Sequence, residues 1–78
     1  MRYFKMYKCG GQEDFEITKD EARRTLAGHW DEKALNDIFD NDRAFRLFTP
    51  YADVWTQTET EDGLVLVPMA GFYGIVGV

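Results

Sequence analysis

The hydrophobic residues of this chain change their spacing near Arg43, and this change limits what the chain can fold into. Before Arg43, residues 18–42 carry apolar side chains at the spacing of short amphipathic helices. After it, apolar residues first alternate with polar ones and then run continuously, which is typical of β-strands. Together with a strand pair at the start, this order predicts an α+β domain in which helices cover one face of an antiparallel sheet.

The first 17 residues predict a β-hairpin. If Gly10 and Gly11 form a two-residue turn, each residue before the turn has a defined partner after it. This register places apolar residues opposite apolar ones and bases opposite acids: Phe4 with Ile17, Met6 with Phe15, Lys5 with Glu16, and Lys8 with Glu13. We therefore expect Met6 and Phe15 to be buried neighbours.

Two short helices are expected next. Thr18 followed by Glu21 is a capping box that begins a helix over residues 19–27, and Gly28 ends it. Asp31 is an N-cap for a second helix over residues 32–39. The residues expected to face the core lie at helical spacing and are Ala22, Leu26, Leu35, Ile38 and Phe39.

The second half of the chain predicts strands, which bring the expected sheet to about five. Residues 44–49 and 53–60 have strand patterns, and Asp62-Gly63 is a strong hairpin turn. Residues 64–70 are expected to form a strand buried on both faces, with an exposed edge used for pairing as the alternative, and residues 72–78 one more short strand. The sheet face without helices should be at least half exposed, with Tyr3 and Tyr7 on it.

The length and composition are those of one small folded unit. A chain of 78 residues, 45% of them hydrophobic, is expected to form a single compact domain over residues 1–78. The single cysteine excludes an internal disulfide, and Arg2, Lys5 and Lys8 interrupt any secretory segment, so we expect the cytoplasm. Residues 64–78 are uncharged but shorter than a membrane helix requires, and no membrane contact is expected.

No pattern of catalytic or metal-binding residues is complete. The acids around Asp40 lack the glycine and the bidentate glutamate of a calcium loop, since Tyr51 occupies the last position. Cys9 and His29 are the only soft ligands and the only nucleophile–base pair, with no third orienting group. We therefore predict a protein without catalytic residues, metal or cofactor, and keep a small hydrolase using Cys9 and His29 as a third alternative.

The charges favour a positively charged partner. The net charge is −5, and all nine Lys and Arg residues lie between Arg2 and Arg46. Residues 47–78 hold four acids and no base, so direct binding to nucleic-acid phosphates is not expected. A basic protein surface is the natural counterpart of such a chain, which we expect to be a monomer or a small homo-oligomer.

Three aspartates stand where a helix should not have them. Asp37, Asp40 and Asp42 surround the expected C-terminus of the second helix, where the helix dipole disfavours negative charge. A partner's Arg or Lys would make this placement favourable. We therefore predict a partner-binding surface that consists of Asp31, Glu32, Asp37, Asp40 and Asp42, with Tyr51 and Trp55 as its aromatic residues.

Over its whole length the chain resembles the small acidic anti-CRISPR proteins of phages, in particular inhibitors of type I systems. The resemblance is one of size, acidity and layout, and runs from "MRYFKMYKCGGQEDFEITKDEARRTL" through "DEKALNDIFDND" to "TPYADVWTQTE". It implies a non-enzymatic inhibitor that binds a Cas protein of the surveillance complex in an infected bacterial host and blocks DNA recognition. The alternative is another phage or mobile-element protein, a toxin-neutralising or host-takeover module that covers a basic site.

Overall fold

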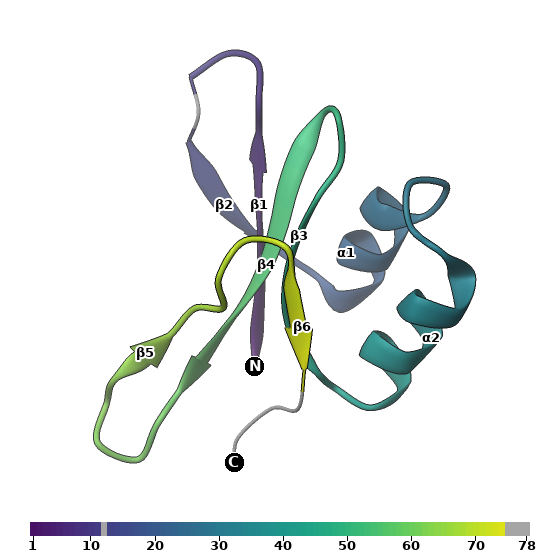
Figure 1. Ribbon diagram of the computed structural model, residues 1–78. Helices are drawn as coiled ribbons and strands as arrows, with labels where there is room; N and C mark the ends of the chain where they lie inside the picture. The colour runs from purple at the N-terminus through teal and green to yellow at the C-terminus, as the bar shows by residue number, and fades with distance from the viewer. Residues whose placement is uncertain (12, 75–78) are drawn as a thin grey trace.

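The computed structural model describes residues 1–11 and 13–74, and it consists of one antiparallel sheet with two helices on one face (Figure 1). The elements are β1 (Arg2–Tyr7), β2 (Asp14–Ile17), α1 (Lys19–Leu26), α2 (Glu32–Asp40), β3 (Ala44–Phe48), β4 (Ala52–Glu59), β5 (Val65–Leu66) and β6 (Phe72–Gly74). The predicted α+β fold is confirmed, with six strands where about five were expected.

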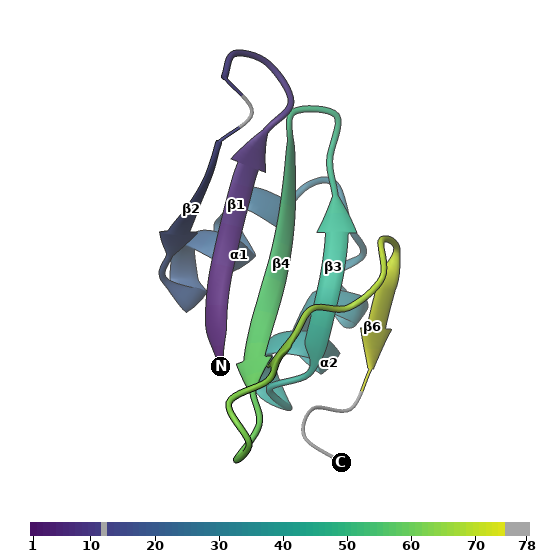
Figure 2. The ribbon, with the colours of Figure 1, turned by 90° about the vertical axis from the view of Figure 1, so that its left-hand side faces the viewer.

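β4 lies at the centre of the sheet. The strand order is β2-β1-β4-β3-β6, and all neighbours are antiparallel (Figure 2). Within the described residues β5 pairs only with β4, at Thr58 and Glu59. β1 covers one edge of β4 from Ala52 to Gln57, and β3 covers the other from Asp53 to Trp55. The first strand of the chain therefore completes its pairing only with a strand about fifty residues later.

Both helices begin as the sequence predicts. The Thr18 hydroxyl accepts a hydrogen bond from the Glu21 N–H at 3.1 Å, and Asp31 caps α2 by accepting one from the Lys33 N–H at 3.4 Å. α1 ends before Gly28, whose φ of +84° is a left-handed conformation that glycine adopts without strain. The helix limits are confirmed to within one residue.

The core lies between the helices and one face of the sheet. Its centre is aromatic: the Phe39 ring of α2 lies 5.4 Å from that of Phe45 and 6.2 Å from that of Tyr3. All five predicted helix residues are buried there, and the cluster as a whole is Tyr3, Ala22, Leu26, Leu35, Ile38, Phe39, Phe45, Leu47 and Val54. The helical stripes therefore supply half of this layer and the alternate residues of the strands the other half.

The register of the first hairpin is one residue away from the prediction. Tyr3 pairs with Ile17 and Lys5 with Phe15, because the connection between β1 and β2 spans residues 8–13 and not two residues. A slip of one residue turns every side chain to the other face. Tyr3 therefore faces the helices and is 8% exposed, contrary to the expected exposed face, and Met6 and Phe15 are not partners.

Residues 64–70 do not form the expected buried strand. β5 contains only Val65 and Leu66, which are 56% and 52% exposed. β1 pairs with β4 from Ala52 to Gln57 and β3 from Asp53 to Trp55, and β5 pairs with the end of β4 that follows, at Thr58 and Glu59.

After β5 the chain crosses the sheet face opposite the helices to reach β6, which pairs with β3 (Figure 2). Trp55 lies on this face and is only 6% exposed, stacked on Phe4 with Arg46 over its ring. The helix-free face is therefore partly covered. The strand expected over residues 72–78 is confirmed for Phe72–Gly74, and residues 75–78 lie outside the described residues.

We expect Phe45→Ala to cost about 3–5 kcal/mol, since it empties the centre of the core. Phe15→Ala should cost only about 1 kcal/mol, because its side chain is 41% exposed and contacts Tyr7 outside the core. Urea unfolding of both variants measures these losses. Equal losses at the two positions would contradict the observed register.

Candidate functional site

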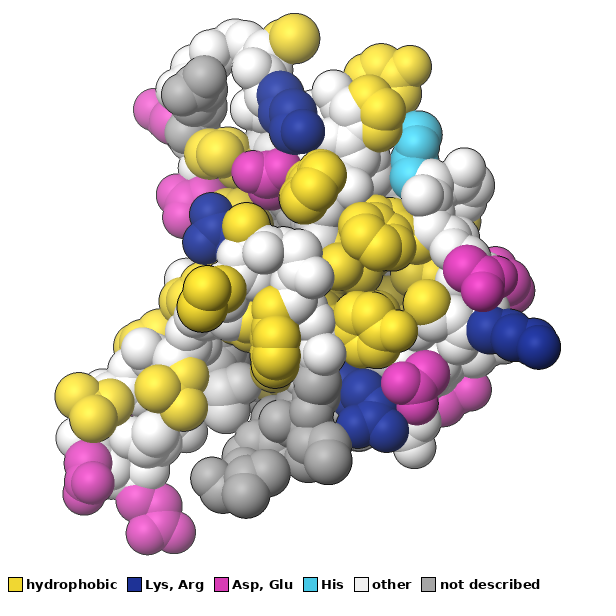
Figure 3. Space-filling view, in the orientation of Figure 1, with side chains coloured by type: hydrophobic (Ala, Val, Ile, Leu, Met, Phe, Trp, Pro, Cys, Tyr) yellow, Lys and Arg dark blue, Asp and Glu magenta, His cyan; other side chains and the backbone are white. Residues whose placement is uncertain are grey.

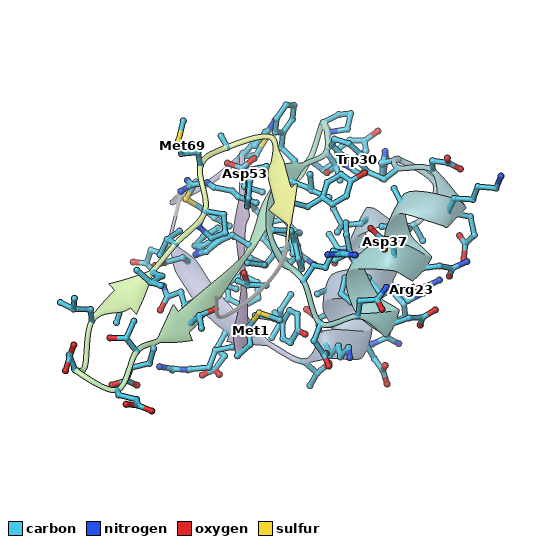
Figure 4. The ribbon with its side chains drawn as sticks, turned by 60° about the horizontal axis from the view of Figure 1, so that its bottom comes forward. Met1, Arg23, Trp30, Asp37, Asp53 and Met69 are labelled. Atoms are coloured by element: carbon cyan, nitrogen blue, oxygen red, sulfur yellow. The ribbon has the colours of Figure 1, made fainter. Side chains whose placement is uncertain are left out.

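The carboxylates predicted to bind a partner lie on and around α2. We call Asp31, Glu32, Asp37, Asp40 and Asp42 the α2 acidic surface. α2 belongs to the layer of helices that covers one sheet face, and Figure 4 shows Asp37 there together with Arg23 of α1, on the opposite side of the molecule from Met69. The structure therefore brings the five predicted acids onto one helix and its two ends.

The C-terminus of α2 explains the unusual position of Asp42. The Arg43 N–H donates to the Ile38 carbonyl at 2.9 Å, and Asp42 between them has a φ of +50°. This is a Schellman-type helix end, in which glycine usually takes the left-handed position and Asp or Asn is the tolerated replacement. Asp42 therefore ends the helix.

Asp42 also has a cationic partner within the chain. Its Oδ1 lies 2.7 Å from Lys19 Nζ of α1. The hydrogen bond from Lys19 lowers the pKa of the Asp42 carboxyl below its ordinary value of 3.8, and the same bond raises the pKa of Lys19. The unfavourable charge at the helix end is thus compensated from the neighbouring helix.

Two further acids of this surface have partners as well. Asp37 Oδ2 lies 3.0 Å from Arg43 Nε in an ion pair that is not a hydrogen bond. Asp37 Oδ1 accepts a hydrogen bond from Asn41 Nδ2 at 3.1 Å. Glu32 accepts a hydrogen bond from Arg23 at 2.7 Å. These contacts fix the carboxylates in place.

The paired carboxylates remain accessible. The side chains of Glu32 and Asp42 are 70% and 69% exposed, and that of Asp37 is 43% exposed. Asp31 and Asp40 are exposed too. A carboxylate has about four acceptor positions, so one internal ion pair leaves others free for a second donor. The α2 acidic surface can therefore accept hydrogen bonds from a partner without losing its internal contacts.

Of the two predicted aromatic residues, only Tyr51 lies near this surface. Tyr51 lies in the β3–β4 turn and is 69% exposed. Its ring contacts the ring of His29 edge-on, with 5.8 Å between the ring centroids, and His29 precedes Asp31 by two residues. A shallow groove runs beside it, lined by Gly28, His29, Trp30, Phe48, Thr49 and Pro50. Trp55 lies on the opposite sheet face and is buried, so the structure separates it from the other predicted residues.

The sequence analysis missed a second acidic region, the end of β4 with the turn that follows it. Residues 18–43 hold seven acids and five bases, whereas Glu61 and Asp62 stand in a segment, residues 47–78, without any base. Exposed Leu64, Val65 and Leu66 follow directly. The absence of bases after Arg46 is visible in the sequence, but because residues 64–70 were expected to be buried, no binding surface was predicted there.

The structure assembles no other chemical centre from the predicted candidates. His29 contacts Tyr51, and Cys9 is exposed in the β1–β2 connection. Within residues 1–11 and 13–74, no group of three His, Cys, Asp or Glu side chains is arranged to hold a metal ion. The two helices that these residues form have eight and nine residues, and neither has the length and apolarity of a membrane span.

We expect Asp42→Asn to test the helix end, since Asn keeps the left-handed conformation and removes the charge. The folded-state pKa of Asp42 lies below 3.8, so its ion pair adds stability above that pH and loses it as the pH falls through the lowered value. The variant should have a lower Tm than wild type at pH 6, with the difference disappearing in acid. Asp40→Asn is the control and should leave Tm unchanged or slightly raised. A pH-independent loss in Asp42→Asn would contradict the ion pair.

Comparisons with known proteins give no match for this chain: no family model matches it, and neither do curated proteins or solved structures.

Proposed function

We propose that this protein is a non-enzymatic inhibitor that binds a basic surface of a partner protein through the α2 acidic surface. The resemblance to small acidic anti-CRISPR proteins suggests the partner class, a Cas protein of a type I surveillance complex. By occupying Arg and Lys side chains that bind DNA phosphates, the inhibitor would block target recognition.

The observation that carries this proposal is that the surface combines fixed geometry with exposure. Lys19, Arg23 and Arg43 hold three of its carboxylates within 3.0 Å, yet these carboxylates remain 43–70% exposed. Side chains that are already ordered lose less conformational entropy on binding. Carboxylate oxygens left free can accept the paired N–H groups of a partner's arginine, which is the stronger type of hydrogen bond.

The aromatic residues beside Asp31 suit the same role. Tyr51 is exposed, and Trp30 is held by a hydrogen bond from its Nε1 to the Phe48 carbonyl at 2.9 Å. Tyrosine and tryptophan are enriched at the centres of protein interfaces, whereas charged residues give specificity and a fast, salt-dependent association. The groove next to Tyr51 can take an apolar side chain or the aliphatic stem of a lysine or arginine.

The second candidate is a toxin-neutralising or host-takeover protein of a phage or mobile element. It would use the same carboxylates on a different basic site, so the α2 acidic surface does not distinguish the two. Competition with DNA does: an anti-CRISPR protein prevents a surveillance complex from binding target DNA, whereas the alternative has no effect on it.

We expect the triple variant Asp31→Asn, Glu32→Gln, Asp40→Asn to stay folded, because Asn is an equally good N-cap. Its affinity for a type I surveillance complex should fall at least tenfold at low salt, and less at high salt, because exposed charges are screened. Calorimetry at two salt concentrations measures the affinity and its salt dependence. Binding of target DNA by the surveillance complex in the presence of each variant is the second readout.

The control for this experiment is the triple variant Glu13→Gln, Asp14→Asn, Glu16→Gln. It also removes three carboxylates and one exposed arginine ion pair, that between Arg2 and Glu16 at 2.8 Å, but on the first hairpin. Its affinity should stay within a factor of two or so of wild type. An equal loss in both variants would show a general effect of net charge and reject the α2 acidic surface as the contact.

We expect Cys9→Ser, which lies outside the α2 acidic surface and its groove, to inhibit as well as wild type, provided that circular dichroism shows a folded protein. A nucleophile paired with a base would lose essentially all turnover on such a change. Loss of inhibition in the folded Cys9→Ser variant, with binding retained, would favour the small hydrolase instead.

A further inference from the structure

The end of β4, its turn and β5 present hydrophobic side chains to solvent where the sequence pattern is that of a buried strand. We call residues 58–67 the β4–β5 arm. It contains four consecutive apolar residues, and all of them are exposed: Leu64 (63%), Val65 (56%), Leu66 (52%) and Val67 (42%). Monomeric soluble proteins rarely leave so continuous an apolar stretch uncovered unless it binds something.

Both faces and one edge of this arm are open. Val65 and Leu66 are successive strand residues whose side chains point to opposite faces, and each is more than half exposed. Among the described residues β5 pairs only with β4, so its second edge carries free backbone groups. Figure 1 shows the arm projecting away from the helices and from the rest of the sheet. An apolar, unpaired edge strand is a template for another strand.

The charges on the arm define what can bind there. Glu61 and Asp62 form its tip, and Glu59 at its base is close enough to Arg2 to contribute to the raised pKa of that residue. No Lys or Arg lies between Phe48 and the end of the chain. Figure 3 shows the result at its lower left, where hydrophobic and acidic side chains lie together without a basic one.

A second copy of this chain fits the arm poorly. Antiparallel pairing of two arms would bring Glu61 and Asp62 of each arm near Glu59 of the other, and neither arm carries a Lys or Arg. Arg2 of β1 lies near Glu59, but it already forms an ion pair with Glu16 at 2.8 Å. A strand that alternates apolar residues with Lys or Arg would instead extend β5 with backbone hydrogen bonds, cover Val65 or Leu66, and pair with the carboxylates.

We propose that the β4–β5 arm binds an edge strand of another protein in which apolar residues are flanked by lysine or arginine, and that β5 pairs with it through its free edge. This inference rests on the proposed function for the identity of the natural partner, because that partner would be the same basic protein that binds the α2 acidic surface. It adds a second contact, on the other side of the molecule from α2, and it can be tested without that partner.

The probe is a capped octapeptide of alternating lysine and valine, titrated into the labelled protein while amide NMR shifts are followed. We expect saturable shifts confined to residues 58–67 and the nearby start of β1, weakened by salt. The same peptide with glutamate in place of lysine should give none. Shifts on α2 alone, no saturable shifts, or equal binding of both peptides would overturn the proposal.

Charge reversal at the tip separates this site from a general attraction. Glu61→Lys with Asp62→Lys should weaken peptide binding roughly tenfold or more, while Glu13→Lys with Asp14→Lys on the other hairpin should leave it within about twofold. Equal weakening of peptide binding in both double variants would show that the peptide responds only to the net charge of the protein and would overturn the proposed site.

Analytical ultracentrifugation tests whether a second copy of this chain binds the arm. Wild type should be monomeric at low salt, whereas the variant Glu59→Gln, Glu61→Gln, Asp62→Asn should associate, because the carboxylates that keep two arms apart are gone. Adding Leu64→Ser and Leu66→Ser should reverse that association. A wild-type dimer whose interface maps to the arm would assign this surface to a second copy and overturn the basic partner.

The two proposals can fail separately. If the α2 variant inhibits a surveillance complex normally while the arm binds the lysine peptide as described, the proposed function is wrong in its contact surface and the arm stands. If the arm does not bind the lysine peptide while the α2 variant loses inhibition, the proposal for the arm is wrong and the α2 acidic surface stands.

Discussion

The pairing of β4 on both edges is the constraint on which the rest of this structure depends. β1 covers it from Ala52 to Gln57 and β3 from Asp53 to Trp55, and this fixes which side chains of all three strands face the helices. Tyr3 enters the core because it lies opposite Thr56, and the first hairpin adopts the register that follows from this. β5 pairs with β4 only beyond this region, at Thr58 and Glu59, so the most hydrophobic stretch of the chain stays outside the core.

The helical layer shows how acidic residues can be structural and available at once. Asp42 ends α2 and pairs with Lys19, and Asp37 pairs with Arg43 just beyond the same helix end. These contacts explain why aspartates are tolerated at the negative end of a helix dipole. They do not use up the oxygens, since the side chains remain well exposed. An internal explanation for these acids and a role in binding are therefore compatible.

Features that depend on a few neighbouring residues could be predicted from the sequence. The caps at Thr18 and Asp31 are of this kind, and so is the buried stripe of Leu35, Ile38 and Phe39. The register of the first hairpin could not be predicted in this way, because it depends on the pairing of β1 with β4, a strand distant in sequence. Likewise, the acids of α2 were identified but not their partners, since Lys19 and Asp42 are 23 residues apart. Trp55 was placed on the binding surface because nothing local shows that the segment after β5 crosses over its face.

The place of β1 between β2 and β4 has a consequence for the making of the protein. Tyr3 leaves the ribosome more than fifty residues before Thr56, the residue opposite it, and β6 must still reach β3. Contacts so far apart in sequence form late and slowly compared with helical turns. The nascent chain therefore emerges with its first strand unpaired on one edge, and the sheet closes only after β4 and β6 have been synthesised. A stop codon anywhere before β4 would leave hairpin and helices without a common core.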